Sequence, residues 1–199
     1  MPAKNVTKVY VEDSYYHVYN RGASKQKVFR DDEDYEVFLS LFKRYLDPKG
    51  AKMPNRQPYP CYAKEVSLMA YCLMPNHYHL LVYQSSKDGM KKLLTSIGTA
   101  YSMYFNRKYH HVGTVFQQRY RAVRMTDDAQ FAHISRYIHL NPEDYIRWPW
   151  SSLGYYLGDK HAAWLNTELL PDVSNYRKFL DDYVDRRDEL KLLSKQLAG

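Results

Sequence analysis

The chain has 199 residues, of which 45% are hydrophobic, and its formal net charge is +7. This length fits one domain with appendages, and the apolar fraction is large enough to bury a core. Two cysteines, Cys61 and Cys72, are too few for a disulfide framework and indicate a reducing compartment. No apolar segment approaches the length of a membrane span or of a secretory signal, so we expect a cytoplasmic protein with no membrane partner.

Basic and aromatic residues together favour a polyanionic partner. The sequence pI is near 9.2, and 21 residues are tyrosine. Positive charge attracts phosphates and aromatic rings stack on exposed bases, so this composition favours nucleic acid. Tyrosine is also common in cores and protein interfaces, so composition alone does not decide the function class.

The first part of the chain predicts a strand, a helix and a long connection. Residues 15–20 have the aromatic and β-branched content of a strand. Asp31 can cap the helix that follows, whose apolar side chains recur at helical spacing from Tyr35 to Leu46. Residues 47–60 contain four prolines and therefore predict a loop.

A histidine pair follows on a predicted hairpin of residues 66–73 and 77–83. Strand alternation sends His77 and His79 to one face and Tyr78 to the other. Two imidazoles on one rigid strand supply half of a metal site. Such a pair also arises by chance on half-buried strands, so the rest of the chain must decide its role.

The second half predicts a helix at residues 89–108, a strand at 114–125 and a further helix. Asp127 or Asp128 can cap this last helix and Asn141 ends it, and helical spacing turns its apolar residues Phe131, Ile134 and Ile138 toward the core. Alternation along the strand places three polar side chains on one face: Gln117, Arg119 and Arg121. Basic residues there suit DNA phosphates, and a solvated face paired with carboxylates explains them equally well.

The order of elements predicts an α+β fold with a ferredoxin-like split βαβ sheet, its helices on one face and one added helix. Residues 174–193 predict a charged amphipathic helix. We therefore divide the chain into a catalytic domain at 1–157 and a C-terminal helical extension at 158–199. His17 is expected to face the same way as Tyr15 and Tyr19, and the pattern assigns it no role.

Seven blocks in a fixed order carry a family resemblance. They are Tyr16–Gly22, Phe29–Asp32, Ala70–Val82, Tyr104–Arg107, Gly113–Arg119, Arg136–Pro142 and Trp150–Ser152. Through these blocks, which are spread over most of the chain, it resembles the single-tyrosine HUH transposases, specifically the REP-associated tyrosine transposases and their insertion-sequence relatives.

The resemblance implies an HUH endonuclease fold and a nuclease that cuts single-stranded DNA beside hairpins. It implies His77 and His79 as metal ligands, Tyr137 as nucleophile and Asn141 as a further polar ligand. Two imidazoles and an amide oxygen suit Mg²⁺ or Mn²⁺. Composition alone would assign Tyr137 to the core. The basic residues expected at the DNA are Arg21, Arg107, Arg119 and Arg121.

The sequence leaves several functions open. The leading hypothesis is a transposase that nicks and transfers single strands through a 5′-phosphotyrosine. No phosphate-binding glycine loop or dinucleotide fingerprint is present in the sequence, which agrees with a reaction that needs no nucleotide fuel. The alternatives are a domesticated hairpin-binding protein without turnover, a small metal-dependent hydrolase, and a zinc site of Cys72, His77 and His79. The partner is single-stranded or hairpin DNA, and a homodimer is also open.

Overall fold

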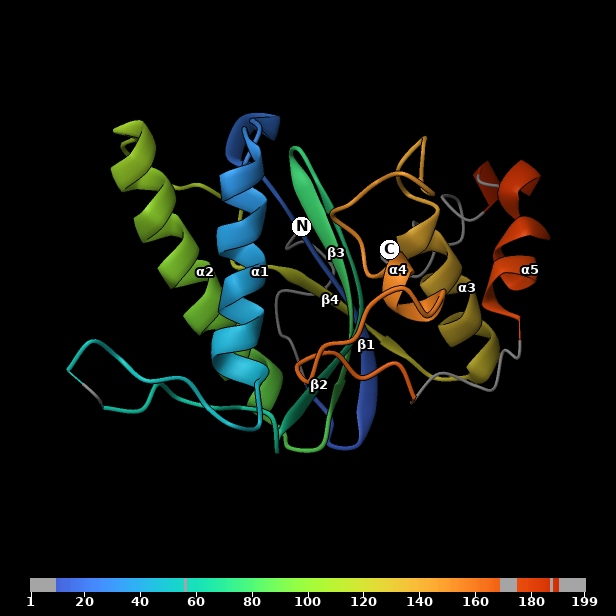
Figure 1. Cartoon of the computed structure of the whole chain (residues 1–199), viewed down its shortest axis with the longest axis horizontal. Helices are drawn as coiled ribbons and strands as arrows, with labels where there is room; N and C mark the ends of the chain where they lie inside the picture. The colour runs from blue at the N-terminus through green and yellow to red at the C-terminus, as the bar shows by residue number, and fades with distance from the viewer. Residues whose placement is uncertain (1–9, 56, 169–174, 187, 190–199) are drawn as a thin grey trace, which may run out of the picture.

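A four-stranded antiparallel sheet forms the centre of the protein (Figure 1). The computed structural model describes residues 10–55, 57–168, 175–186 and 188–189. The strands are β1 (Ser14–Arg21), β2 (Val66–Met74), β3 (His77–Gln84) and β4 (Arg121–Met125), in the spatial order β2-β3-β1-β4. This order and the helices between the strands confirm the predicted ferredoxin-like split βαβ fold.

Helices lie on both sides of the sheet (Figure 1). The two helices of the split βαβ units pack on one face, as predicted, and a third helix packs on the other. The helices are α1 (Asp32–Leu46), α2 (Gly89–Tyr109), α3 (Asp128–His139), α4 (Leu153–Tyr156) and α5 (Tyr176–Asp181), with short 3-10 turns at Ala23–Lys25 and Val184–Arg186. Asp31 and Asp127 accept hydrogen bonds from the first turns of α1 and α3, so both predicted caps are confirmed.

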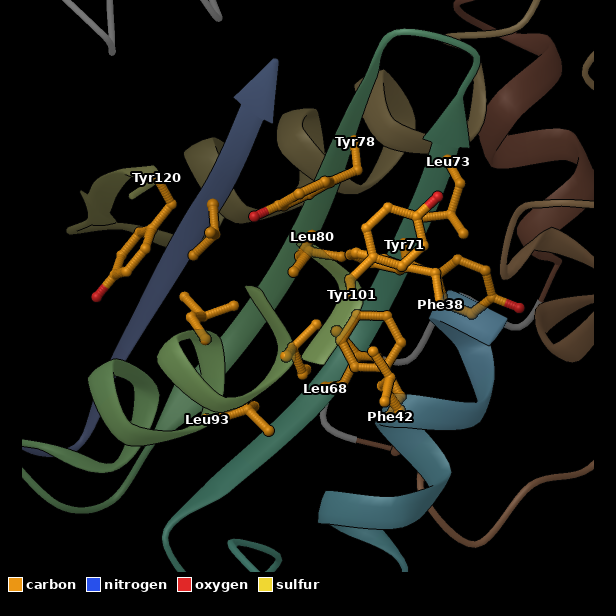
Figure 2. Packing of buried hydrophobic residues seen from close by; sticks show 14 of the residues in the cluster. Phe38, Phe42, Leu68, Tyr71, Leu73, Tyr78, Leu80, Leu93, Tyr101 and Tyr120 are labelled. Carbon is orange, nitrogen blue, oxygen red and sulfur yellow. The ribbon is translucent and has the colours of Figure 1, made fainter. Parts of the chain in front are cut away.

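The larger core lies between the sheet and the layer of α1 and α2 (Figure 2). Phe38 of α1 and Tyr101 of α2 meet there in an edge-to-face contact. Strand alternation brings Tyr78 and Leu80 of β3 into the same core. Each such buried side chain contributes roughly 1.5–3 kcal/mol through the hydrophobic effect, so this face holds the fold together.

A second core lies between the opposite face of the sheet and α3. Phe131, Ile134 and Ile138 of α3 are buried against Cys72 of β2 and Leu81 of β3. These are the three α3 residues that helical spacing predicted to face the core. The histidines of β3 share this side with Leu81, because they alternate with Tyr78 along the strand.

The segment before β4 differs from the prediction of a strand over 114–125, since β4 begins only at Arg121. The buried side chain of Asn20 explains the difference, because its amide donates 2.8 Å hydrogen bonds to the carbonyls of Gln118 and Arg119. Those carbonyls are therefore taken by a side chain and not by a neighbouring strand. Regular pairing of β1 with β4 starts at Tyr19 and Arg121.

The C-terminal region forms less regular helix than predicted within the described residues. The predicted helix of residues 174–193 is represented by α5 and the turn at Val184–Arg186, and its end lies outside the described residues. Tyr176 and Leu180 of α5 are buried against Leu140 and Leu153. No helix in the described part of the chain has the length and apolar content needed to cross a bilayer.

Candidate active site

A cavity of about 440 Å³ opens on the α3 side of the sheet. Its walls come from β1, β3, the segment before β4, and α3. The lining residues are His17, Tyr19, Asn20, Arg21, His77, His79, Gln117, Gln118, Arg121 and Tyr137. The fold thus brings together five predicted site residues that are more than one hundred positions apart from first to last: Arg21, His77, His79, Arg121 and Tyr137.

Tyr137 of α3 lies over the imidazoles of β3. Its hydroxyl is 3.5 Å from Nε2 of His79, and the two rings meet edge to face with centroids 5.0 Å apart. His77 and His79 are themselves 5.0 Å apart between ring centroids. The contacts of Phe131, Ile134 and Ile138 with the sheet hold α3 in this position.

Both imidazoles have Nδ1 occupied by a neighbouring side chain. His77 donates from Nδ1 to Oδ1 of Asn76 over 2.7 Å, and Nδ1 of His79 lies 3.0 Å from Nε2 of His17. With Nδ1 engaged, Nε2 is the ring nitrogen left to face a ligand, and metal-binding histidines usually have such a hydrogen bond at their other nitrogen. The two imidazoles therefore fit a divalent metal.

Asn141 supplies an amide next to this pair. Although α3 ends at His139, the Asn141 side chain is near enough to His77 to act on its pKa, which burial lowers and Asn141 raises. Two imidazole nitrogens and one amide oxygen are a mixed donor set that suits Mn²⁺ and is acceptable to Mg²⁺. The donor set expected from the resemblance is thus close together in space.

The histidines of the cavity are held neutral at ordinary pH. Burial lowers the pKa of His17 to about 3, and burial lowers the pKa of His79 well below its usual value. Burial also lowers the pKa of His77, where the charge of Arg21 acts in the same direction. A neutral imidazole is the form that binds a metal.

The alternative zinc site is not supported by the geometry. No three His, Cys, Asp or Glu side chains in the described ranges are placed to share one metal ion. Cys72 is fully buried, its sulfur lies 3.7 Å from that of Met74, and burial raises the pKa of its thiol. Cys72 is therefore a core residue between β2 and α3.

The four predicted DNA-binding arginines do not lie together. Arg21 and Arg121 line the cavity and are exposed, so both can reach a phosphate. Arg119 is exposed but does not line the cavity. Arg107 lies in the last turn of α2, in the layer across the sheet from α3 (Figure 1).

Sequence reasoning assigned no site role to four polar residues of the cavity, which are His17, Asn20, Gln117 and Gln118. Gln117 and Gln118 enter it because Asn20 draws their segment toward β1. His17 was given no role, although strand alternation already placed it beside Tyr19. What the sequence lacked was the register, in which Tyr19 pairs with His79 and brings His17 next to the pair of histidines on β3.

Comparison with known proteins finds a family model over part of the chain and similar solved structures. Residues 58–141, which include both histidines and Tyr137, match the family model described as Transposase IS200 like. A solved REP-associated tyrosine transposase bound to a REP hairpin is similar to the chain with a TM-score of 0.57 and 11% identity, over 85% of this chain and 98% of that one.

A candidate transposase from Deinococcus radiodurans R1 is similar with a TM-score of 0.42 and 16% identity, over 68% of this chain and 95% of that one. No curated protein matches the chain. The fold is that of the REP-associated tyrosine transposase, and the resemblance expected from the sequence is confirmed. The match to the IS200-like transposase model over residues 58–141, together with this fold, supports a DNA-processing enzyme.

Proposed function

We propose that the protein nicks single-stranded DNA beside a hairpin and rejoins the ends, through a 5′-phosphotyrosine on Tyr137 and with a divalent metal held by His77, His79 and Asn141. One observation carries this proposal: the Tyr137 hydroxyl lies 3.5 Å from His79 Nε2 in a cavity that two arginines also line. A nucleophile, metal-binding imidazoles and phosphate-binding groups thus share one space.

The reaction follows from the groups present. The oxygen of Tyr137 forms a bond to phosphorus while the bond from phosphorus to the 3′ oxygen breaks. The proton lost by the tyrosine hydroxyl is matched by the proton gained at the leaving 3′ oxygen. The phosphotyrosine keeps the energy of the ester bond, so a 3′ hydroxyl from another strand can reverse the step and complete strand transfer.

A metal bound to the imidazoles would polarise a phosphate oxygen and stabilise the charge that develops at phosphorus. Arg21 and Arg121 would hold the flanking phosphates. The cavity tyrosine Tyr19 offers a ring on which an unpaired base can stack. Duplex DNA hides both base faces, which favours a single-stranded segment as substrate.

The hairpin part of the proposal has its own support. The similar structure holds a REP hairpin, so this fold can bind that form of DNA. A net charge of +7 suits the phosphates of a hairpin stem.

The direct test is to trap the covalent adduct. Wild-type protein is incubated with Mn²⁺ and a labelled hairpin that has single-stranded flanks, and adducts are mapped by mass spectrometry. We expect a nucleotide on Tyr137, and none with Tyr137→Phe, which removes one oxygen and little packing. Tyr83→Phe is the matched control, because Tyr83 is on the same strand as the histidines and its hydroxyl donates a hydrogen bond to the exposed Asp13.

An adduct on another tyrosine would contradict the assignment of the nucleophile. Cleavage without any adduct would favour the metal-dependent hydrolase. Hairpin binding without cleavage under all metal conditions would favour a domesticated binding protein.

The metal is tested with His77→Ala. This variant should lose cleavage and Mn²⁺ binding while keeping hairpin affinity, because the metal acts mainly on the transition state. His161→Ala is the control, since His161 is exposed and outside the cavity. Cleavage by His77→Ala at the wild-type rate would remove His77 from the ligand set.

A further inference from the structure

His17 is a buried histidine that the reaction proposed above does not use. Its side chain is 2% exposed, and it projects from β1 into the same cavity as the metal-binding pair. Its ring stacks on that of His79 at a centroid distance of 5.1 Å, and its Nε2 lies 3.0 Å from Nδ1 of His79. The two histidines therefore share one proton along this contact.

The position of that proton decides whether His79 can bind a metal. A neutral imidazole carries one N–H and one lone pair. If His79 donates from Nδ1 to His17, its Nε2 keeps the lone pair that faces Tyr137. If His17 donates instead, Nε2 of His79 carries a proton and cannot ligate.

His77 does not have this ambiguity, because its Nδ1 contacts the amide oxygen of Asn76, which only accepts. That contact fixes the ligating form of His77. His79 reaches the same form only when His17 acts as the acceptor.

We propose that His17 is a positioning residue that accepts the Nδ1 proton of His79 and so holds the His79 ring with Nε2 open to the metal. This inference rests on the proposed function. His17 itself must then carry its proton on Nδ1, which is buried without a partner among the described residues. Such an unpaired donor is unfavourable, so the two forms compete until a metal on His79 selects one.

The affinity of the site for a metal should therefore depend on a hydrogen-bond acceptor at position 17. Loss of a second-shell partner of a metal-binding histidine weakens metal binding by about 10–100-fold. His17→Phe keeps a ring of similar size and removes the acceptor. His17→Gln keeps an acceptor oxygen on a flexible chain and should restore part of the affinity.

The experiment measures Mn²⁺ affinity by titration calorimetry on the full chain without DNA, for wild type, His17→Phe, His17→Gln and His77→Ala. We expect His17→Phe to bind Mn²⁺ about 10–100-fold more weakly than wild type, with His17→Gln between them. Hairpin affinity should stay at the wild-type level. Equal Mn²⁺ affinity of wild type and His17→Phe would overturn the inference.

His77→Ala distinguishes failure of the metal site from failure of the role of His17. If it also binds Mn²⁺ as wild type does, the metal site itself is wrong and the proposed function fails. If it loses Mn²⁺ while His17→Phe does not, only the role of His17 fails. Equal loss in the Phe and Gln variants would also count against the acceptor and for simple packing.

A measurement on the wild type does not depend on whether variants fold. Long-range proton–nitrogen NMR of the histidine rings, in protein saturated with Mg²⁺, reports which ring nitrogen carries the proton. We expect His79 and His17 both to be protonated at Nδ1. A proton on Nε2 of His17 in that state would overturn the inference.

Discussion

His139 connects the end of α3 to the C-terminal helices, and we expect its replacement to change both stability and its pH dependence. His139 is fully buried, with Nδ1 2.6 Å from the hydroxyl of Tyr176 and Nε2 2.7 Å from that of Ser152. In His139→Phe the Ser152 hydroxyl can still bond to the carbonyl of Tyr71. The Tyr176 hydroxyl loses its bond to the imidazole and keeps its interaction with Ser135. The loss of the two hydrogen bonds of His139 therefore costs about 2–3 kcal/mol at pH 7.

The same substitution removes a group that titrates on unfolding. Burial lowers the pKa of His139 to about 3 from 6.5. Between these values the unfolded chain binds a proton that the folded chain does not, so His139 makes the wild type less stable as the pH falls below 6.5. Two pH units below 6.5, at pH 4.5, this loss amounts to about 3 kcal/mol. Phenylalanine lacks this effect, so the gap between wild type and variant should nearly close at pH 4.5.

Urea denaturation between pH 7.5 and 4.5, followed by tryptophan fluorescence, measures both effects. Tyr176→Phe is the control, because it removes the hydroxyl and keeps the imidazole, so its stability should follow pH as the wild type does. His17 is also buried with its pKa lowered to about 3, and its contribution cancels in the comparison. Parallel pH dependences for wild type and His139→Phe would refute the argument.

Two further predictions concern DNA binding. Affinity for a hairpin with single-stranded flanks should fall steeply as the salt concentration rises. In a plot of log affinity against log salt concentration, Arg121→Ala should make the slope shallower by about 0.7, the value for one single-strand phosphate contact. An unchanged slope would exclude Arg121 from contact with a phosphate. Asn20→Ala should weaken hairpin binding and lower the free energy of unfolding by about 2–3 kcal/mol, since two carbonyls lose their donor. Asn20→Asp should behave similarly, because aspartate keeps only the acceptor. If both variants bind the hairpin as the wild type does, the segment before β4 holds its position without Asn20.

The sheet and its two cores follow closely from the sequence. Apolar spacing predicted the buried face of α1 and of α3, and alternation predicted the opposite directions of Tyr78 and the histidines. These patterns are local, since each depends on the period of one element. The start of β4 could not be predicted in this way, because the side chain that replaces the strand pairing, Asn20, lies about one hundred positions earlier.

The site was predictable in its parts and not in its assembly. His77 and His79 are visible as a pair on one strand, whereas His17 joins them only through the pairing of β1 with β3. Arg121 pairs with Tyr19 across another long-range contact and thereby reaches the cavity, while Arg107 ends in the other helical layer. Charge alone does not show which of Arg107 and Arg121 reaches the cavity, because that depends on the register of the strands.

The choice of Tyr137 among 21 tyrosines shows how geometry adds to a motif. Several other tyrosines belong to the large core, and burial raises the pKa of Tyr78 and Tyr101, so neither forms an oxyanion easily. Tyr19 and Tyr137 are the tyrosines among the residues that line the described cavity.

Of these two tyrosines, only Tyr137 has its hydroxyl within 3.5 Å of Nε2 of His79 in the contacts of the described residues. Its helical neighbour Arg136 is held away from the cavity, because its guanidinium stacks on Phe179 and donates to the carbonyl of that residue. Contacts of α3 with the sheet on one side and with α5 on the other therefore leave Tyr137 directed at the imidazoles. The same contacts that stabilise the helix orient the candidate nucleophile.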